Sequence, residues 1–275
     1  MKLSHPSLSA FKAVLGLILT LTLYQNCLAQ TEFKLMTYNI YHGENPSKPG
    51  TSNLEDIADL IQEIQPDFVA LQEVDSLTGR SASLNDGVPQ NLVRELADMT
   101  GMHGYFGKAI DFDGGGYGEG ILSREPVQVR KVMLPIPRGG EDRAMLIAES
   151  KLPNGNRFLF AGTHLCHQFD ENRLAQVEKI NEVFSDTGQP SILLGDLNFV
   201  PGSVPYQTLE NYWVDIAKRA GSVEPTISYE NPTRRIDYMF ALQKSLAQVE
   251  IIDIEVLNVG YSDHMPIVAT IQILQ

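Results

Sequence analysis

Short apolar runs recur along the chain and have the lengths of β-strands. They are rich in Val, Ile, Leu and Phe, and charged or turn-forming residues separate them. The run SILLG at 191 is continuously apolar, as in strands covered on both faces, whereas VQVRKVML at 127 alternates, as in strands with one face in water. The pattern predicts strands over 33–40, 67–74, 120–123, 127–136, 144–152, 157–165, 191–198, 235–242, 249–258 and 265–274.

Helical spacing separates some of these strands. In the segment 53–64, apolar residues recur every three or four positions and stop before Pro66, and the segments 90–101 and 171–184 behave likewise. The pair Asn154–Gly155 between two strands is a strong hairpin signal. Hairpins and helical crossovers together predict mixed sheets. A sandwich of two such sheets with helices outside fits this α/β pattern better than a barrel or a single doubly wound sheet.

The first 29 residues differ from the rest of the chain. Lys2 and Lys12 precede the apolar run AVLGLILTLTLY, which is too short to span a bilayer comfortably. Cys27 and Ala29 supply small residues of the kind that a signal peptidase recognises. We therefore predict a signal peptide over 1–29, a single domain over 30–275, and a secreted or periplasmic protein. Lipid attachment at Cys27 is the less favoured alternative.

Length and charge limit the possible functions. A chain of 275 residues, 43% of them hydrophobic, can bury one sizeable core. The formal net charge is −13, and removal of the basic leader would make it about −15. Tight binding to long nucleic acid needs a stripe of Lys and Arg that releases counterions, so this acidic balance argues against it. Cys166 would be the sole cysteine of the mature chain, which excludes an internal disulfide.

Polar residues with chemical potential stand where the apolar strands end. Any one of them alone would be read as a turn former or a buried histidine. If the strands run in roughly the same direction, however, these ends meet at one edge. Asp196 and Asn198 are two apart on a predicted strand and should point to the same side. The polar residues are Asn39, Glu73, His164, Asp196, Asn198, Asp237, Asp263 and His264.

Such a cluster predicts a bound cation. Burying unpaired charged groups costs several kcal/mol each, and a divalent cation would offset that cost. Oxygen donors from Glu73, Asn39 and Asp263 suit Mg²⁺ or Mn²⁺, with Ca²⁺ as a further option. Zinc is disfavoured because Cys166 adjoins a histidine instead of standing at ligand-pair spacing.

The ordered motifs TYNI, LQEV, YGEGILSR, THL, GDLN, RIDY and SDHMP resemble the endonuclease/exonuclease/phosphatase superfamily. This superfamily includes deoxyribonuclease I-like nucleases, neutral sphingomyelinases and inositol polyphosphate 5-phosphatases. The resemblance runs from about residue 33 to the C-terminus. It implies a four-layer α/β/β/α sandwich and a metal-dependent phosphoric ester hydrolase.

The resemblance also implies a role for each motif residue. Glu73, Asn39 and Asp263 would hold the metal. His264, polarised by Asp237, would act as a general base or as a donor to the phosphate. The implied roles continue with Asp196 and Asn198, which would orient the attacking water and bind a phosphoryl oxygen, and with His164, which would contact the phosphate.

Glu119 extends this comparison, because a glutamate in the deoxyribonucleases pairs with the histidine that corresponds to His164. We therefore predict two histidine–carboxylate pairs, His264 with Asp237 and His164 with Glu119. Two such pairs favour a phosphodiester over a monoester. A surface-exposed Glu119 in a glycine-rich loop is the alternative.

The substrate is not determined by these motifs. We expect the phosphate-binding edge to be lined by Arg80, Tyr117, Arg143 and Arg173, with His42 at its rim. A phosphodiesterase or nuclease is favoured, a phospholipid-headgroup or sugar-phosphate phosphatase is the alternative, and a catalytically silent binding module is the alternative outside enzymes. No protein partner is evident, and we expect a monomer.

Overall fold

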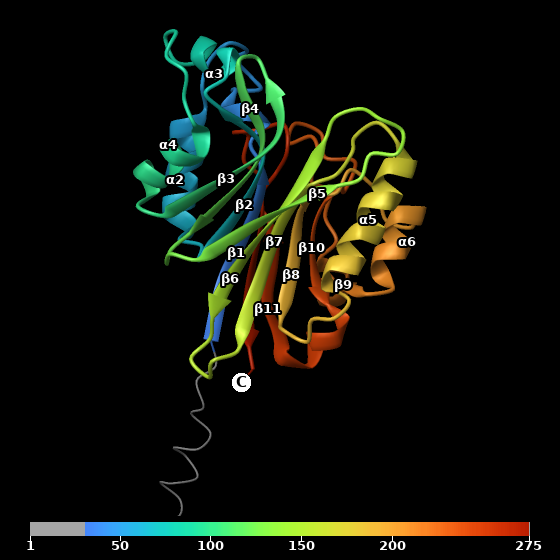
Figure 1. Cartoon of the computed structure of the whole chain (residues 1–275). Helices are drawn as coiled ribbons and strands as arrows, with labels where there is room; N and C mark the ends of the chain where they lie inside the picture. Colours follow the sequence, from blue (N-terminus) through green and yellow to red (C-terminus); the bar gives the residue numbers. More distant parts are fainter. Residues whose placement is uncertain (1–30, 275) are drawn as a thin grey trace, which may run out of the picture.

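The computed structural model describes residues 31–274 as two β-sheets packed face to face, with helices on both outer faces (Figure 1). The predicted four-layer α/β/β/α sandwich is confirmed. The predicted signal peptide over 1–29, including Cys27, lies outside the described residues. Within residues 31–274, no helix is long and apolar enough to cross a membrane.

The first sheet has six strands in the order β11-β12-β1-β2-β4-β3. Its central pair β1 and β2 is parallel, and the other neighbours are antiparallel. The strands are β1 (Thr31–Asn39), β2 (Phe68–Ser76), β3 (His103–Phe112), β4 (Gly115–Ser123), β11 (Val249–Val256) and β12 (Ile267–Ile273).

The second sheet also has six strands, in the order β5-β6-β7-β8-β10-β9. The pair β7 and β8 is parallel, and the others are antiparallel. The predicted Asn154–Gly155 hairpin is confirmed, because Leu152 N donates to Asn156 O at 2.8 Å between β6 and β7. The strands are β5 (Gln128–Leu134), β6 (Arg143–Lys151), β7 (Arg157–His164), β8 (Ser191–Asp196), β9 (Trp213–Asp215) and β10 (Asp237–Leu242).

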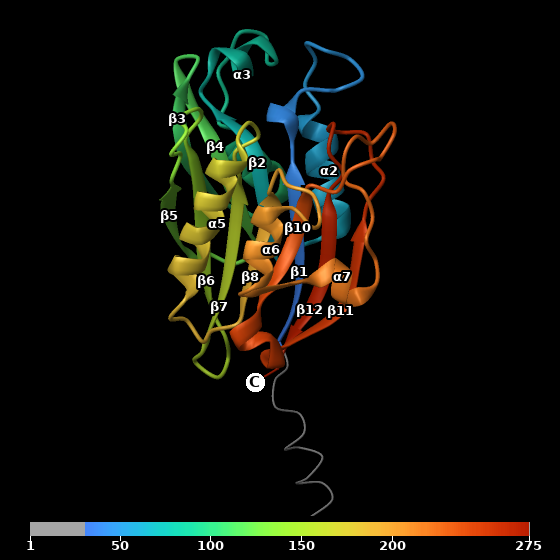
Figure 2. The ribbon, with the colours of Figure 1, turned by 90° about the vertical axis from the view of Figure 1, so that its right-hand side faces the viewer.

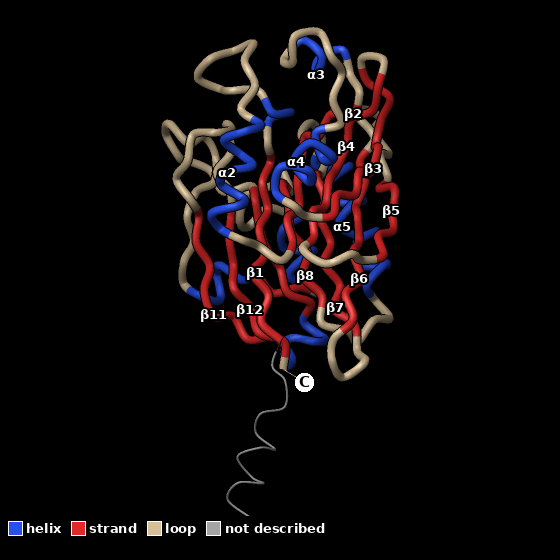
Figure 3. The backbone as a smooth tube through the Cα atoms, turned by 90° about the vertical axis from the view of Figure 1, so that its left-hand side faces the viewer, coloured by secondary structure: helices blue, strands red, loops and turns tan. Residues whose placement is uncertain are grey.

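Amphipathic helices cover the outer faces. Helices α2 (Leu54–Ile64) and α4 (Leu92–Thr100) pack their apolar sides on the first sheet (Figure 3). Helices α5 (Asp170–Phe184) and α6 (Val204–Glu210) cover the second sheet (Figure 2). The remaining short helical segments are η1 (Tyr41–Gly43), α3 (Gly79–Ser83), α7 (Ile216–Ala220) and η2 (Gln243–Gln248).

Apolar side chains from both sheets fill the space between them. The rings of Phe68 and Phe160, one from each sheet, stack with centroids 5.0 Å apart. Phe33 stacks on Phe158 in the same way at 4.8 Å. These side chains are buried, so the interface between the sheets forms a hydrophobic core that holds the strand ends in place.

Two strands lie where the apolar pattern predicted none. β3 is an edge strand whose positions are exposed or half-buried except Gly107, and β9 is very short, so neither produces an apolar run. β4 also begins at Gly115, before the predicted start at 120. A side chain at Gly118 would place its Cβ 2.2 Å from Gly107 O on β3. The close pairing of β3 and β4 therefore requires glycine, a residue that sequence patterns count against strands.

The predicted convergence of strand ends is confirmed. β1 and β8 finish side by side, and Asn39 Nδ2 donates to Asp196 Oδ2 at 3.1 Å across 157 positions of sequence. β10 and β12 run the opposite way, so Asp237 and His264 reach the same edge from their N-terminal sides. This edge lies at the end of the sandwich away from the C-terminus (Figure 1).

Candidate active site

Asp196 is the centre of the candidate site, because side chains from both sheets converge on its carboxylate. Asn39 Nδ2 donates to Asp196 Oδ2 and to Glu73 Oε1, both at 3.1 Å. His164 Nε2 and His264 Nε2 lie 3.4 and 3.7 Å from Asp196 Oδ2. Apart from Glu73, these side chains are buried. The site is therefore a dense polar cluster set into the end of an apolar core.

Gly195 places this carboxylate. Its φ is +140°, and a Cβ at this position would lie 1.9 Å from Thr163 O on the neighbouring strand. β7 and β8 can approach each other this closely at the site only because position 195 has no side chain. The glycine of the GDLN motif thus sets the register that puts His164 opposite Asp196.

Asn198 does not continue the strand, contrary to the sequence prediction. β8 ends at Asp196, and Asn198 has a left-handed φ of +52°. Asn198 N donates to Asp196 Oδ1 at 3.0 Å, and Asn198 Nδ2 donates to Leu165 O at 3.1 Å. Leu197, between Asp196 and Asn198, is buried in the core. A tight turn, not strand alternation, brings Asp196 and Asn198 to the same cavity.

Glu73 stands on a bulge inside β2. The pairing of β2 with β4 shifts register between Leu71 and Val74, and Glu73 has a φ of +59°. The bulge turns its carboxylate toward Asn39 and toward His42, whose Nδ1 lies 3.9 Å away. Burial alone would raise the pKa of Glu73, but His42, Asn39 and the site histidines together hold it below its usual range. Glu73 is therefore ionised.

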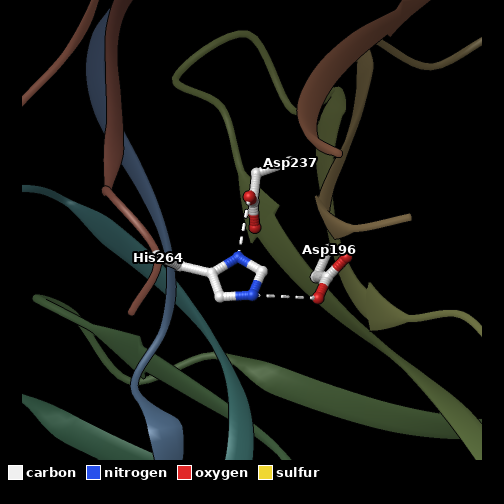
Figure 4. Close-up of side chains that lie close together, drawn as sticks. All are labelled: Asp196, Asp237 and His264. Atoms are coloured by element: carbon white, nitrogen blue, oxygen red, sulfur yellow. Dashed lines mark hydrogen bonds and ion pairs between the residues drawn. The ribbon is translucent and has the colours of Figure 1, made fainter. Parts of the chain in front are cut away.

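The predicted pair of His264 and Asp237 is present (Figure 4). His264 Nδ1 lies 2.9 Å from Asp237 Oδ2, and Nε2 points toward Asp196. Burial opposes the charged form of His264, but Asp237 and Asp196 outweigh it and raise its pKa to about 10. His264 is therefore a protonated imidazole held between two carboxylates.

The predicted pair of His164 and Glu119 is not formed. His164 Nδ1 instead lies 3.3 Å from Arg143 Nη1. Burial and this guanidinium lower the pKa of His164 well below its usual value, so the ring is neutral. Glu119 is a buried residue of β4, and its Oε2 has no hydrogen-bond partner among residues 31–274. Burial raises the pKa of Glu119 well above its usual value, so this carboxyl is a neutral acid.

The burial of Glu119 predicts a pH-dependent stability. The contribution of the protonated Glu119 carboxyl to the free energy of unfolding is fully present below its ordinary pKa of 4.5. This contribution is lost as the pH rises toward the raised pKa of the folded state. Glu119→Gln should therefore stabilise the protein at pH 8 but not at pH 4, with the difference growing by about 1.4 kcal/mol per pH unit in that window. Urea unfolding at both pH values, with the exposed Glu63→Gln as control, measures it. Equal stability of Glu119→Gln and the wild type at pH 8 would contradict a buried neutral acid.

A cavity of about 440 Å³ opens beside the cluster. Glu73, Asp196, Asn198, His164 and His264 line one part of it. The rest of the polar lining is contributed by Tyr117, Glu141, Arg143, His167, Arg173 and Arg234. Arginine side chains therefore face the carboxylates across this space, as a site for an anionic substrate requires.

Arg143 is the most deeply buried of these arginines. Its side chain is 2% exposed and contacts Glu141 Oε1 at 2.8 Å and His167 Nδ1 at 3.1 Å. Its Nε has no hydrogen-bond partner among the described residues. Three of the predicted substrate residues, Tyr117, Arg143 and Arg173, thus line the cavity.

Arg80 lies behind the cavity wall instead of in it. Its guanidinium binds Asp75 through two hydrogen bonds of 2.8 Å and lies over the ring of Tyr117 at 5.3 Å. Asp75 binds Nε and Nη2 and so holds the guanidinium against Tyr117, and a role of Arg80 in substrate binding stays a prediction. Sequence spacing could not reveal this, because Asp75 looks like an ordinary turn residue.

The charges of the cluster fit a divalent cation. Burial and Asp237 raise the pKa of Asp196 to about 7, and burial also raises that of Asp263. Carboxylates with raised pKa values mark an excess of negative charge that a cation would neutralise. Ligand atoms of Asp196, Asp237 and His264 all lie within 4.8 Å of one another. His264 and Asp237 already bind each other, however, whereas the carboxylates of Glu73 and Asp196 both accept from the amide of Asn39.

The other predicted ligands are placed less directly. Asn39 presents its amide nitrogen to Glu73, while its Oδ1 accepts from Tyr41 N at 3.1 Å. Asp263 Oδ1 lies 3.3 Å from Ser262 Oγ, whose single proton is donated to Asn39 O at 2.7 Å. The ligand set Glu73, Asn39 and Asp263 stays a prediction.

Ser262 was missed in the sequence. Its Oγ donates to Asn39 O at 2.7 Å and accepts from His264 N at 3.2 Å. This hydroxyl links the end of β1 to the segment before β12, and so fixes His264 relative to Asn39. Its position two residues before His264 in YSDHMP was the available signal.

Comparison with known proteins places this geometry in a family. The sequence profile of the Endonuclease/Exonuclease/phosphatase family matches residues 36–264, which includes every member of the cluster. No curated protein matches the sequence.

Solved structures share the fold at low identity. An endonuclease/exonuclease/phosphatase from Beutenbergia cavernae has a TM-score of 0.72 and 24% identity over 88% of this chain and 72% of that one. A mannosyl-6-phosphatase from Bacteroides thetaiotaomicron has a TM-score of 0.69 and 19% identity over 87% of this chain and 99% of that one. The human nocturnin catalytic domain with bound sulfate has a TM-score of 0.65 and 16% identity over 88% of this chain and 97% of that one. The motif order, the sandwich fold and the family profile agree, and the chain belongs to the endonuclease/exonuclease/phosphatase family.

Proposed function

We propose that this protein hydrolyses phosphoester bonds of small organic molecules with a divalent cation and an activated water. The observation that carries the proposal is the buried Asp196, which contacts Asn39, His164 and His264 beside an arginine-lined cavity. The family's hydrolytic chemistry supports the reaction type.

Different side chains accept the proton of the water, donate to the phosphate and hold the cation. Asp196, held by Asn39 Nδ2 and by the backbone N–H of Asn198, accepts the proton of the attacking water. As the water oxygen bonds to phosphorus, the bond from phosphorus to the alcohol oxygen breaks, and the leaving alcohol takes up a proton from solvent. His264 is protonated and donates from Nε2 to a phosphoryl oxygen, while Asp237 keeps the proton on the ring. A cation held by Glu73, with Asn39 and Asp263 as the other predicted ligands, would neutralise charge on the phosphate; Mg²⁺ or Mn²⁺ is the simplest choice.

A small substrate is favoured over nucleic acid. The cavity encloses about 440 Å³, and Arg143, Arg173 and Arg234 are its cations. The chain as a whole carries a net charge of −13, which opposes a long polyanion. The expected preference for diesters rested on two histidine–carboxylate pairs, and only the pair of His264 and Asp237 is present. The sugar-phosphate alternative therefore gains weight, and similarity to a mannosyl-6-phosphatase supports it.

Chromogenic esters test the proposal. We expect p-nitrophenyl phosphate or bis-p-nitrophenyl phosphate to be hydrolysed with Mg²⁺ or Mn²⁺, and EDTA to abolish the reaction. The ratio of the two rates separates monoesters from diesters, and plasmid DNA tested alongside should be cut slowly or not at all. Absence of metal-dependent turnover on all of these substrates would favour the silent binding module instead.

Export is part of the proposal. Residues 1–29 have the charge and apolar pattern of a signal peptide. We expect the enzyme to act outside the cytoplasm as a monomer on phosphoesters present there. N-terminal sequencing of protein from the culture medium or periplasm should begin at Gln30.

A further inference from the structure

A second cavity adjoins the proposed phosphoester site. It encloses about 590 Å³ between α6, α7 and the segment 223–235. Its apolar lining is aliphatic apart from Tyr206, and includes Val200, Pro201, Val223 and Pro225. Val200 and Val223 are 44% and 58% exposed, so their side chains are available to a ligand.

The two cavities share part of one wall. Val200 and Arg234 line both of them. Val200 follows closely on Asp196 and Asn198 in the loop after β8, so this wall is fixed to the proposed catalytic edge. A molecule whose phosphate occupies the first cavity can therefore extend past Val200 into the second.

Most charged side chains of the second cavity form ion pairs with other residues of the protein. Lys218 Nζ donates to Glu210 Oε1 at 2.7 Å, and Arg235 forms a buried ion pair with Asp215. Glu224 is exposed. What remains for a ligand is chiefly aliphatic surface, which binds apolar groups by removing them from water.

Arg234 lies where the phosphate of such a ligand would be bound. Its side chain is exposed and forms no ion pair with the residues that the structure describes, although it lies in the wall common to both cavities. A ligand that combines a phosphate with an aliphatic group matches this order of surfaces: carboxylates and arginines first, then Arg234, then valines and prolines.

We propose that the second cavity binds an aliphatic group of the substrate, so that the preferred substrates are phosphoesters carrying a short alkyl chain. The inference rests on the proposed function, because the first cavity must hold the phosphate. Val223 contributes to alkyl binding, whereas Arg234 contributes to phosphate binding.

Calorimetric titration with methyl, butyl and hexyl phosphate tests this assignment, with EDTA present so that the ligands are not hydrolysed during the measurement. We expect the Kd to fall about two- to fourfold per added methylene. Val223→Asp should abolish this dependence on chain length and leave the Kd of methyl phosphate unchanged. Arg234→Gln should weaken all three ligands by the same factor.

Val204→Asp is the matched control, because Val204 is 63% exposed but does not line the cavity. It should keep the wild-type dependence on chain length. Equal Kd values for the three phosphates in the wild type, or the same chain-length dependence in Val223→Asp and Val204→Asp, would overturn the proposal. Hydrolysis of p-nitrophenyl phosphate by the same protein preparations, with Mg²⁺ in place of EDTA, reports separately on the proposed function.

Discussion

Replacing His264 with alanine is expected to lower phosphoester turnover by about 10²–10⁴-fold, the usual contribution of general acid–base groups. The reason is the position of the imidazole between Asp237, at 2.9 Å from Nδ1, and Asp196, at 3.7 Å from Nε2. No other cation takes this place when the ring is removed, so a phosphoryl oxygen loses its donor. Steady-state kinetics with p-nitrophenyl esters measures the loss.

Two further variants separate chemistry from folding. His103→Ala removes an exposed histidine at the start of β3 and should leave turnover unchanged. Asp237→Asn keeps the shape of the pair but removes the charge that holds the proton on His264, so it should also lower kcat. Circular dichroism and thermal unfolding show whether each variant is folded. A folded His264→Ala variant with wild-type turnover would exclude the assigned role.

Gly195→Ala is expected to destabilise the fold by about 4 kcal/mol or more, or to prevent folding. The added Cβ would stand 1.9 Å from Thr163 O, which is backbone and cannot move away without breaking the β7–β8 pairing. The φ of +140° adds strain of its own for any residue with a side chain. Because the same residue positions Asp196, any folded fraction should also have lost activity.

Gly188→Ala is the matched control, since a Cβ there meets nothing within 4 Å. Urea unfolding of the wild type and both variants gives the free energies directly. Wild-type stability of Gly195→Ala would mean that β7 and β8 do not approach each other as described.

Most of the fold follows from the sequence because its signals are local. The strands β1, β2, β7 and β8 are buried on both faces. Their continuously apolar sequences indicate this burial without any tertiary information. The apolar spacing of α2 and the Asn154–Gly155 turn are equally local. β3 escaped notice because an edge strand with exposed side chains carries no such pattern.

Local sequence patterns predict less of the candidate site than of the fold. Strand ends supplied residues that the structure brings to one edge, since polar groups after apolar runs can be recognised in the sequence. The partners of these residues were not visible. Glu119 and His164 stand in different sheets, and only the packing of the sheets shows that Arg143 reaches His164 first. Likewise, only the structure shows that Asp75 binds Nε and Nη2 of Arg80.

Local patterns and motif order were enough to predict the sandwich of two mixed sheets and the cluster of carboxylates and histidines at one edge. The tertiary structure alone decided which histidine is charged and which carboxyl is neutral, through burial and neighbours distant in sequence. It also decided that Asn198 turns away from its strand and that an aliphatic cavity shares Val200 and Arg234 with the site. Those features arise from contacts between segments, and no single segment encodes them.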